Sequence, residues 1–290
     1  MRKQSNSLCR EITAQIIDSL TGEVGEWIQP WTAHGLPVNA ATRKRYKGIN
    51  VLLLLITALH RGYASNQWVT FNQCKILGGR IKCNAIGTQI VFYQMIDSPI
   101  MIVQEDTGEL DETIEKRMIL RHYTVFNIEQ TSLKIETPTR EFTPVETAER
   151  LLDQLPAVVQ HGGGRAFYNR QKDFIQLPEK ETFKSAADYY ATRLHETIHW
   201  TGGYERLNRL TDDHRFGSTV YAKEELTAEL GAAFLCAHCG IVGKLQHAEY
   251  IASWLKVLEN DVRFIFQASN EAQKAFDFVL GYDREPVIKV

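Results

Sequence analysis

Two histidines four residues apart, with a glutamate directly after the first, form the stretch HETIH at residues 195–199. On a helix, residues four apart share one face, so His195 and His199 can bind the same metal ion. Glu196 then lies one position further round, where it can reach a water at the metal without binding the metal. A bound ion lowers the pKa of that water and polarises a carbonyl, while the glutamate moves the proton to the leaving amine. The spacing predicts a zinc-dependent metallopeptidase with Glu196 as its catalytic residue, and Mn²⁺ as the alternative to Zn²⁺.

The segment YAKEELTAEL, residues 221–230, contains the third ligand that such a site needs. Glu225 and Glu229 lie four residues apart among Ala and Leu, and buried carboxylates need a partner because an unpaired buried charge is costly. The form ELTA resembles the glutamate-ligand branch of HExxH peptidases, in which an acidic residue four positions after the ligand often orients a histidine. This resemblance implies that Glu225 binds the metal and that Glu229 supports a histidine from behind. The reverse assignment stays open.

The first third of the chain combines basic and aromatic residues. Residues 1–96 hold 11 Lys and Arg against 4 Asp and Glu, although the formal net charge of the whole chain is −2. Basic side chains follow phosphates and flat rings accept unstacked bases, so the mixture favours single-stranded nucleic acid over a duplex groove. The alternative is that the tryptophans belong to the core and the basic run is a solvated turn. The residues expected to bind single-stranded DNA are Trp31, Arg43, Lys44, Arg45, Tyr46, Lys47, Trp68, Lys75, Arg80 and Lys82.

The elements expected around the metal site form a mainly helical domain with a small β-sheet. Ser185 and Asp188 are typical of a helix N-terminus, and apolar residues at helical spacing predict a helix from Ser185 to about Trp200 that carries HETIH. Two short strands, RAFYN and FIQLP, are expected on either side of a turn, and an edge of this hairpin could hold an extended substrate. Further helices are expected at residues 147–155, 220–237, 246–267 and 270–280.

The first domain is expected to be α+β. A helix over residues 8–20, an apolar helix capped by Asn50 and ending near His60, and a short helix over Asn72–Leu77 precede the β-rich runs TQIVFYQM, PIMIVQED and KRMILRHYTVFNI. These runs, with the turn-like DTGE between the second and third, predict a small antiparallel sheet. We therefore expect an α+β fold with two domains, residues 1–130 and 145–290, joined by a polar, proline-containing linker at 131–144.

The composition excludes several classes of protein. A chain of 290 residues with 44% hydrophobic residues suits one large globular domain or two ordinary ones. The longest apolar run, at residues 49–59, is too short to span a bilayer, and the N-terminus lacks the apolar core of a signal peptide. Five scattered cysteines do not suggest a disulfide framework. We expect a cytoplasmic protein with reduced thiols and no membrane partner.

Several long motifs from both halves resemble the ArdC-type antirestriction proteins of conjugative plasmids. They are WIQPW, NATRKRYKGIN and WVTFNQ in the first half, and HETIHW, RLNR and GSTVYAKEELTAELGAAFLC in the second. The resemblance covers nearly the whole chain. It implies an N-terminal single-stranded-DNA-binding domain, similar to one in plasmid primases of the TraC type, followed by a zincin-like metallopeptidase domain. It also implies a role in shielding incoming plasmid DNA from host restriction endonucleases.

Three functions are compatible with these features. The first is an antirestriction protein that binds single-stranded DNA and cleaves a protein, such as a restriction endonuclease or another DNA-bound protein. The second is a non-catalytic DNA-binding protein whose HETIH site is structural. The third is a regulatory metallopeptidase that cleaves a repressor of a mobile element, with the basic half serving only to locate it on DNA.

Overall fold

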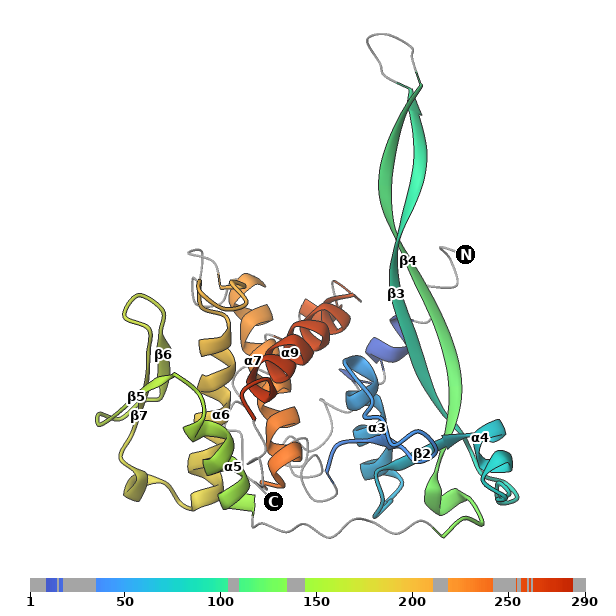
Figure 1. The fold of residues 1–290 in the computed structure, drawn as a ribbon, viewed down its shortest axis with the longest axis horizontal. Helices are drawn as coiled ribbons and strands as arrows, with labels where there is room; N and C mark the ends of the chain where they lie inside the picture. The colour runs from blue at the N-terminus through green and yellow to red at the C-terminus, as the bar shows by residue number, and fades with distance from the viewer. Residues whose placement is uncertain are drawn as a thin grey trace, which may run out of the picture.

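The computed structural model describes residues 9–14, 16–17, 35–103, 110–134, 144–210, 219–241, 254, 257–259, 261 and 263–283. These residues form two parts that lie side by side, an N-terminal α+β part and a C-terminal part of packed helices with a small sheet (Figure 1). This arrangement confirms the expected α+β fold with two domains. Among the described helices, none is long and apolar enough to cross a membrane.

The N-terminal part is built on a four-stranded sheet with the order β1-β2-β4-β3. Strands β3 and β4 pair from Thr88 opposite Val125 to Val103 opposite Leu110, and they extend from the body as a long two-stranded arm (Figure 1). The first two predicted runs, TQIVFYQM and PIMIVQED, form one strand, because β3 runs through Pro99 without a break. Since β3 is at the edge of the sheet, a proline there does not remove a bond to a further strand. The strands are β1 (Val38–Asn39), β2 (Gln67–Thr70), β3 (Thr88–Val103) and β4 (Leu110–Asn127).

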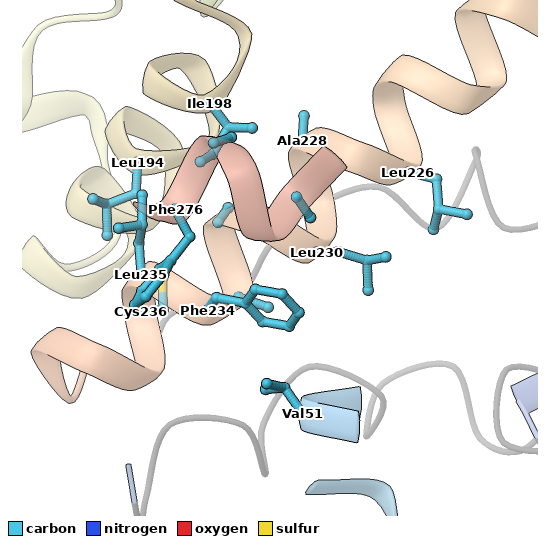
Figure 2. Close-up of a cluster of buried hydrophobic side chains, with 14 of the residues drawn as sticks. Val51, Leu194, Ile198, Leu226, Ala228, Leu230, Phe234, Leu235, Cys236 and Phe276 are labelled. Carbon is cyan, nitrogen blue, oxygen red and sulfur yellow. The ribbon is translucent and has the colours of Figure 1, made fainter. Parts of the chain in front are cut away.

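Helix α3 (Ile49–His60) joins the two parts. One side packs on the sheet, where Leu54 contacts the cluster formed by Trp68 and Val125. The other side belongs to the large core of the second part, and Figure 2 shows Val51 facing the side of α7 that carries Phe234. This double burial explains why the helix is apolar on nearly all sides.

The expectation that Asn50 caps α3 is wrong. The helix begins at Ile49, and the amide of Asn50 binds the backbone of β3 instead: Nδ2 donates to the Val91 carbonyl at 2.7 Å, and Oδ1 accepts from the Val91 amide at 2.8 Å. The short helix α4 (Phe71–Ile76) begins one residue before its predicted start. A capping box between Thr70 and Gln73 fixes this start. The 3-10 helix η1 (Ile128–Gln130) follows β4.

The C-terminal part contains the predicted hairpin and one strand that the prediction missed. Strands β6 (Phe167–Asn169) and β7 (Phe174–Leu177) are antiparallel, and β5 (Val158–His161) pairs in parallel with β7, giving the order β5-β7-β6. The predicted division between helices at 246–267 and 270–280 is wrong, since α9 already begins at Phe264. The helices are α5 (Pro144–Asp153), the 3-10 helix η2 (Lys180–Thr182), α6 (Ala186–Thr201), α7 (Thr219–Cys239) and α9 (Phe264–Leu280).

The region of the expected linker is described only at its ends. Thr131 is buried and forms a β-bridge with Ile81, and Ser132 donates its backbone N–H to the Arg80 carbonyl at 2.9 Å, so both residues contact the first part. Helix α5 begins at Pro144. Residues 135–143 and the DTGE turn lie outside the described residues, and the boundaries at 131 and 144 stay a prediction.

Candidate metal centre

Helix α6 presents the HETIH residues from a well-fixed N-terminus. The hydroxyl of Ser185 accepts from the backbone N–H of Asp188 at 3.1 Å, which satisfies one of the free amides of the first turn. Three turns further on, His195 and Glu196 are buried and His199 is nearly so. The helix ends at Thr201, close to the predicted end near Trp200, and Gly202 is its C-cap.

Helix α7 brings the acidic residues against this face of α6. Gly231 allows the two helices to approach closely, because a Cβ atom at this position would lie only 2.8 Å from Cδ1 of Ile198 on α6. Glu225 and Glu229, which precede Gly231 on the same helix, are both buried. The close packing of α6 and α7 therefore sets the distances between histidines and carboxylates.

Three potential ligand side chains meet between these helices. Nε2 of His195 lies 3.1 Å from Nε2 of His199, and each of these nitrogens lies 3.8 Å from an oxygen of Glu225. All three ligand atoms lie within 4.8 Å of one another. Tetrahedral Zn²⁺, with bonds of about 2.0–2.1 Å to two imidazoles, holds their nitrogens roughly 3.3 Å apart, so the observed spacing fits such an ion.

The remaining carboxylates lie behind the histidines rather than among the ligand atoms. Oε2 of Glu229 lies 3.3 Å from Nδ1 of His195, on the opposite side of the ring from Glu225. Glu224 accepts a hydrogen bond of 2.9 Å from Nδ1 of His199. This arrangement favours Glu225 over Glu229 as the third ligand.

The electrostatics of the site also fit a cation. Burial alone lowers the pKa of His199, but the carboxylates of Glu225 and Glu224 outweigh it and raise that pKa to about 9. When both neutral imidazoles carry their proton on Nδ1, beside Glu224 and Glu229, the lone pairs of the two Nε2 atoms face each other and repel. A positive charge between them, carried by a proton or by a metal ion, relieves this repulsion. Of the four buried carboxylates at the site, Glu224 is the one that forms an ion pair with Arg209, at 2.8 Å.

Glu196 follows His195 on α6 and is buried. Its negative charge contributes to the raised pKa of His199. Glu196 is not one of the three clustered groups, and its catalytic role stays a prediction.

The sequence reasoning missed Glu224 and Arg209. Burial raises the pKa of Glu224, but the hydrogen bond from His199 and the charge of Arg209 outweigh this effect and lower it below its usual value. The signal in the sequence is the RLNR motif, which contains Arg209 and contributes to the family resemblance.

The residues expected to bind DNA are divided between surface, core and the contact between the two parts. An ordered turn holds the basic run: the side-chain oxygen of Asn39 accepts from two backbone amides of the turn, and its Nδ2 donates to Gln73 of α4 at 3.0 Å. Phe71, at the start of α4, is 60% exposed. The basic residues of the expected set that are exposed are Arg43, Lys44, Arg45, Lys47, Lys75, Arg80 and Lys82.

Other members of the expected DNA-binding set have different surroundings. Trp68 is fully buried, so the expectation that its ring stacks on a base is wrong in this structure; the ring supports the sheet instead. Tyr46 is half-buried, and its hydroxyl accepts from Asn39 at 3.3 Å. Lys47 also forms an ion pair with Asp277 of α9 at 2.9 Å. Partial burial of the Arg45 side chain lowers its pKa, and the nearby carboxylates of Asp283 and Asp277 oppose that shift. Trp31 lies outside the described residues.

Comparison with known proteins supports both halves. A family model described as the N-terminal domain of anti-restriction factor ArdC matches residues 6–126, and one described as a zincin-like metallopeptidase matches residues 146–271. The Sinorhizobium fredii protein y4eC is 36% identical over 277 residues, covering 92% of this chain and 90% of that protein. DNA primase TraC of Escherichia coli is 35% identical over 295 residues, covering 96% of this chain but 27% of TraC.

Two crystal structures of the antirestriction protein ArdC from plasmid R388 are similar over nearly their whole length, at 34% sequence identity. The metal-free structure has a TM-score of 0.75 and is matched over 95% of this chain and 97% of that chain. The Mn(II)-bound structure has a TM-score of 0.77, with 96% and 98% covered. The chain therefore belongs to the ArdC family of antirestriction proteins, with an ArdC-type N-terminal domain and a zincin-like metallopeptidase domain.

Proposed function

We propose that this protein binds single-stranded DNA through its first domain and hydrolyses a protein through its second, and that it thereby protects incoming plasmid DNA from host restriction endonucleases. The observation that carries the enzymatic part is the convergence of His195, His199 and Glu225 between α6 and α7. Family membership supports the biological role. Zn²⁺ is the proposed ion, and the Mn(II)-bound relative makes Mn²⁺ the first alternative.

The chemistry assigns a separate role to each side chain. His195, His199 and Glu225 would hold a divalent ion, which when bound polarises a peptide carbonyl and lowers the pKa of water. Glu196 would accept the proton of the attacking water and donate it to the leaving amine. Neither histidine can carry a proton on Nε2 while it binds a metal, so His199 must lose its Nε2 proton when the ion binds.

The small sheet offers a place for an extended peptide. β6 is an edge strand of the order β5-β7-β6, and both β6 and β7 pack against α6, the helix that carries His195. A peptide that adds to the free edge of β6 would gain main-chain hydrogen bonds beside the metal centre. This mode of binding selects the peptide by its extended shape, which suits a protein substrate with an exposed or unfolded segment.

The surface around α4 is the proposed site for single-stranded DNA. The basic turn is held to α4 by the hydrogen bond from Asn39 to Gln73, and the segment that carries Arg80 returns to α4 through a bond from the Gly79 amide to the Cys74 carbonyl at 2.9 Å. Exposed lysines and arginines therefore lie on segments that contact α4, the helix that begins at the exposed Phe71. Positive charge for phosphates next to an aromatic face is the combination that single-strand binding requires.

The variant Glu196→Gln separates catalysis from binding, because Gln has the same size but cannot take a proton. We expect it to keep bound zinc and oligonucleotide affinity but to lose cleavage of a restriction endonuclease and protection in a plasmid-transfer assay. Full protection by Glu196→Gln would contradict the enzymatic part and favour a binding protein. Zinc-dependent cleavage of a mobile-element repressor, with restriction unaffected, would favour the regulatory alternative.

A matched variant tests the DNA-binding part. Replacing Arg43, Lys44 and Lys75 together with Ala should reduce the slope of log affinity against log salt by up to about 0.7 per lost phosphate contact. Replacing Lys172, an exposed lysine of the β6–β7 turn, with Ala should leave this slope unchanged. An unchanged slope in the triple variant would refute the proposed surface.

A further inference from the structure

The motif RLNR, residues 206–209, follows α6, and both of its arginine side chains contact the last turn of that helix. Nε of Arg206 donates to the Trp200 carbonyl, and Nη2 of Arg209 donates to the Ile198 carbonyl, each at 2.5 Å. The carbonyls of the last turn of a helix lack partners within the helix, so both arginines complete its C-terminus. Beyond this shared role, the two side chains have different partners.

Arg209 connects the end of α6 to α7 through Glu224. Its Nε donates to one carboxylate oxygen at 2.8 Å and its Nη2 to the other at 2.9 Å, while Nη1 donates to the hydroxyl of Thr201 at 2.9 Å. Both charged side chains are nearly buried, with 8% and 9% exposed. The planar fork of arginine fits a carboxylate in this two-bonded way, whereas the ammonium of lysine offers a single point of contact.

Glu224, held in place by Arg209, in turn contacts the proposed metal ligand His199. The same oxygen that Arg209 Nη2 contacts also accepts from Nδ1 of His199 at 2.9 Å. With Nδ1 acting as the donor, Nε2 of His199 is the atom left for a metal, and it lies 3.1 Å from Nε2 of His195. The chain of contacts from Arg209 through Glu224 to His199 fixes both the tautomer and the direction of the ring.

We propose that Arg209 and Glu224 are positioning residues that hold His199 ready to bind the metal ion. This inference rests on the proposed function, because it requires that His199 is a ligand. Neither residue touches the ion: Glu224 acts through the imidazole, and Arg209 acts through Glu224. Arg209 also fixes the direction of this carboxylate through two hydrogen bonds, and the carboxylate in turn orients the imidazole as a ligand.

Arg206 provides a matched control within the same motif. It bonds to the same helix end, but its other partners belong to the β6–β7 hairpin: Asp173 at 2.5 Å and the hydroxyl of Tyr168 at 2.7 Å. Its guanidinium also lies over the ring of Trp200, 4.3 Å from the centroid. Loss of Arg206 should disturb the fold without changing the surroundings of His199.

The test compares Zn²⁺ affinity, measured by competition with a chromophoric chelator, in the full-length chain and its variants. Arg209→Lys and Glu224→Gln should each weaken zinc binding by about 10- to 100-fold. Arg206→Lys should keep it within roughly threefold, whatever its effect on the melting temperature of the metal-free protein. Equal zinc affinity in wild type, Arg209→Lys and Glu224→Gln would overturn the proposal, as would an equal loss in Arg206→Lys.

A double variant guards against unfolding of the single ones. Arg209→Met combined with Glu224→Gln removes both buried charges together, so neither is left unpaired, and such replacements are often tolerated. Its circular dichroism should remain that of the wild type while zinc affinity falls at least about tenfold. A folded double variant with wild-type affinity would overturn the proposal. Absence of zinc binding in the wild type would instead refute the proposed metal centre itself.

Discussion

The contact between Gly231 of α7 and Ile198 of α6 permits a sharp test of the packing that sets the site. In the substitution Gly231→Ala, the added Cβ would lie 2.8, 2.9 and 3.0 Å from three side-chain carbons of Ile198, closer than such atoms pack. Ile198 is fully buried, and its β-branched side chain has one strongly preferred rotamer in a helix. The clash must therefore be relieved by moving α6 and α7 apart.

Two opposing effects determine the magnitude. Replacing glycine by alanine inside a helix is worth about 1 kcal/mol in helix propensity. Overpacking a well-filled core typically costs about 1–3 kcal/mol. Since Ile198 cannot retreat, we expect the cost to outweigh the gain, so that Gly231→Ala lowers the free energy of unfolding by up to roughly 2 kcal/mol. It should also weaken metal binding, because the histidines and Glu225 lie on the two helices that separate.

Urea unfolding of the metal-free protein, followed by circular dichroism, measures this effect, and a double-mutant cycle identifies its cause. Ile198→Ala alone should cost about 2–5 kcal/mol by leaving a cavity. In that background the clash is gone, so Gly231→Ala should become stabilising by up to about 1 kcal/mol. If Gly231→Ala raises stability while Ile198 is intact, the close approach of the helices does not limit this position and the reasoning fails.

Three further predictions concern other parts of the molecule. Trp68→Ala should lower the free energy of unfolding by about 3–5 kcal/mol. Phe71→Ala should change the free energy of unfolding by less than about 0.5 kcal/mol, but it should weaken oligonucleotide binding, measured by fluorescence anisotropy, by roughly 1–3 kcal/mol. The opposite pattern would contradict the assignment of core and surface rings. The hydrogen bond from Arg206 lowers the pKa of Asp173 despite partial burial, so Asp173 stabilises the fold above its unfolded pKa and loses this contribution as the pH falls through the lowered value. The difference in melting temperature between wild type and Asp173→Asn, worth less than about 1 kcal/mol at this partly exposed pair, should vanish once the pH falls below the lowered pKa of Asp173, and a difference that grows in acid would have the wrong sign. Glu196→Gln should reduce peptide hydrolysis by at least about 100-fold with metal content unchanged, and a parallel loss of metal would mean that Glu196 is a ligand.

Local patterns in the sequence predicted the elements that carry the site. The N-terminus of α6 follows from Ser185 and the helical spacing of its apolar residues, and the β6–β7 hairpin follows from two short β-rich runs around a turn. β5 was missed because it pairs in parallel with β7, a contact between segments distant in sequence that leaves no alternating pattern in its four residues. Asn50 was taken for a cap because its backbone partner on β3 lies 41 residues away.

Helical periodicity predicted which residues of the candidate site share a helix face, but not which residues of different helices meet. The spacing of His195 and His199, and that of Glu225 and Glu229, placed each pair on one helix face. Which glutamate faces the Nε2 atoms depends on how α6 and α7 pack, and the sequence does not contain that information locally. The chain of contacts from Arg209 through Glu224 to His199 was not predicted for the same reason, since a glutamate on a helix is usually solvated.

The burial of Trp68 illustrates the limit of composition as a guide to binding. A cluster of aromatic and basic residues predicts a nucleic-acid surface, but it does not reveal which rings belong to the core. Trp68 lies on a strand covered by α3, whereas Phe71 follows it at the exposed start of α4. The exposed ring and the exposed cations, rather than the tryptophan, are therefore the residues on which DNA binding should depend.

An anomalous diffraction experiment on crystals grown with Zn²⁺ would locate the ion itself. We expect a single peak for each chain about 2.0–2.2 Å from Nε2 of His195, Nε2 of His199 and a carboxylate oxygen of Glu225, with Glu229 beyond bonding distance. A peak bound by Glu229 in place of Glu225, or no peak between these two helices, would contradict the proposed metal centre.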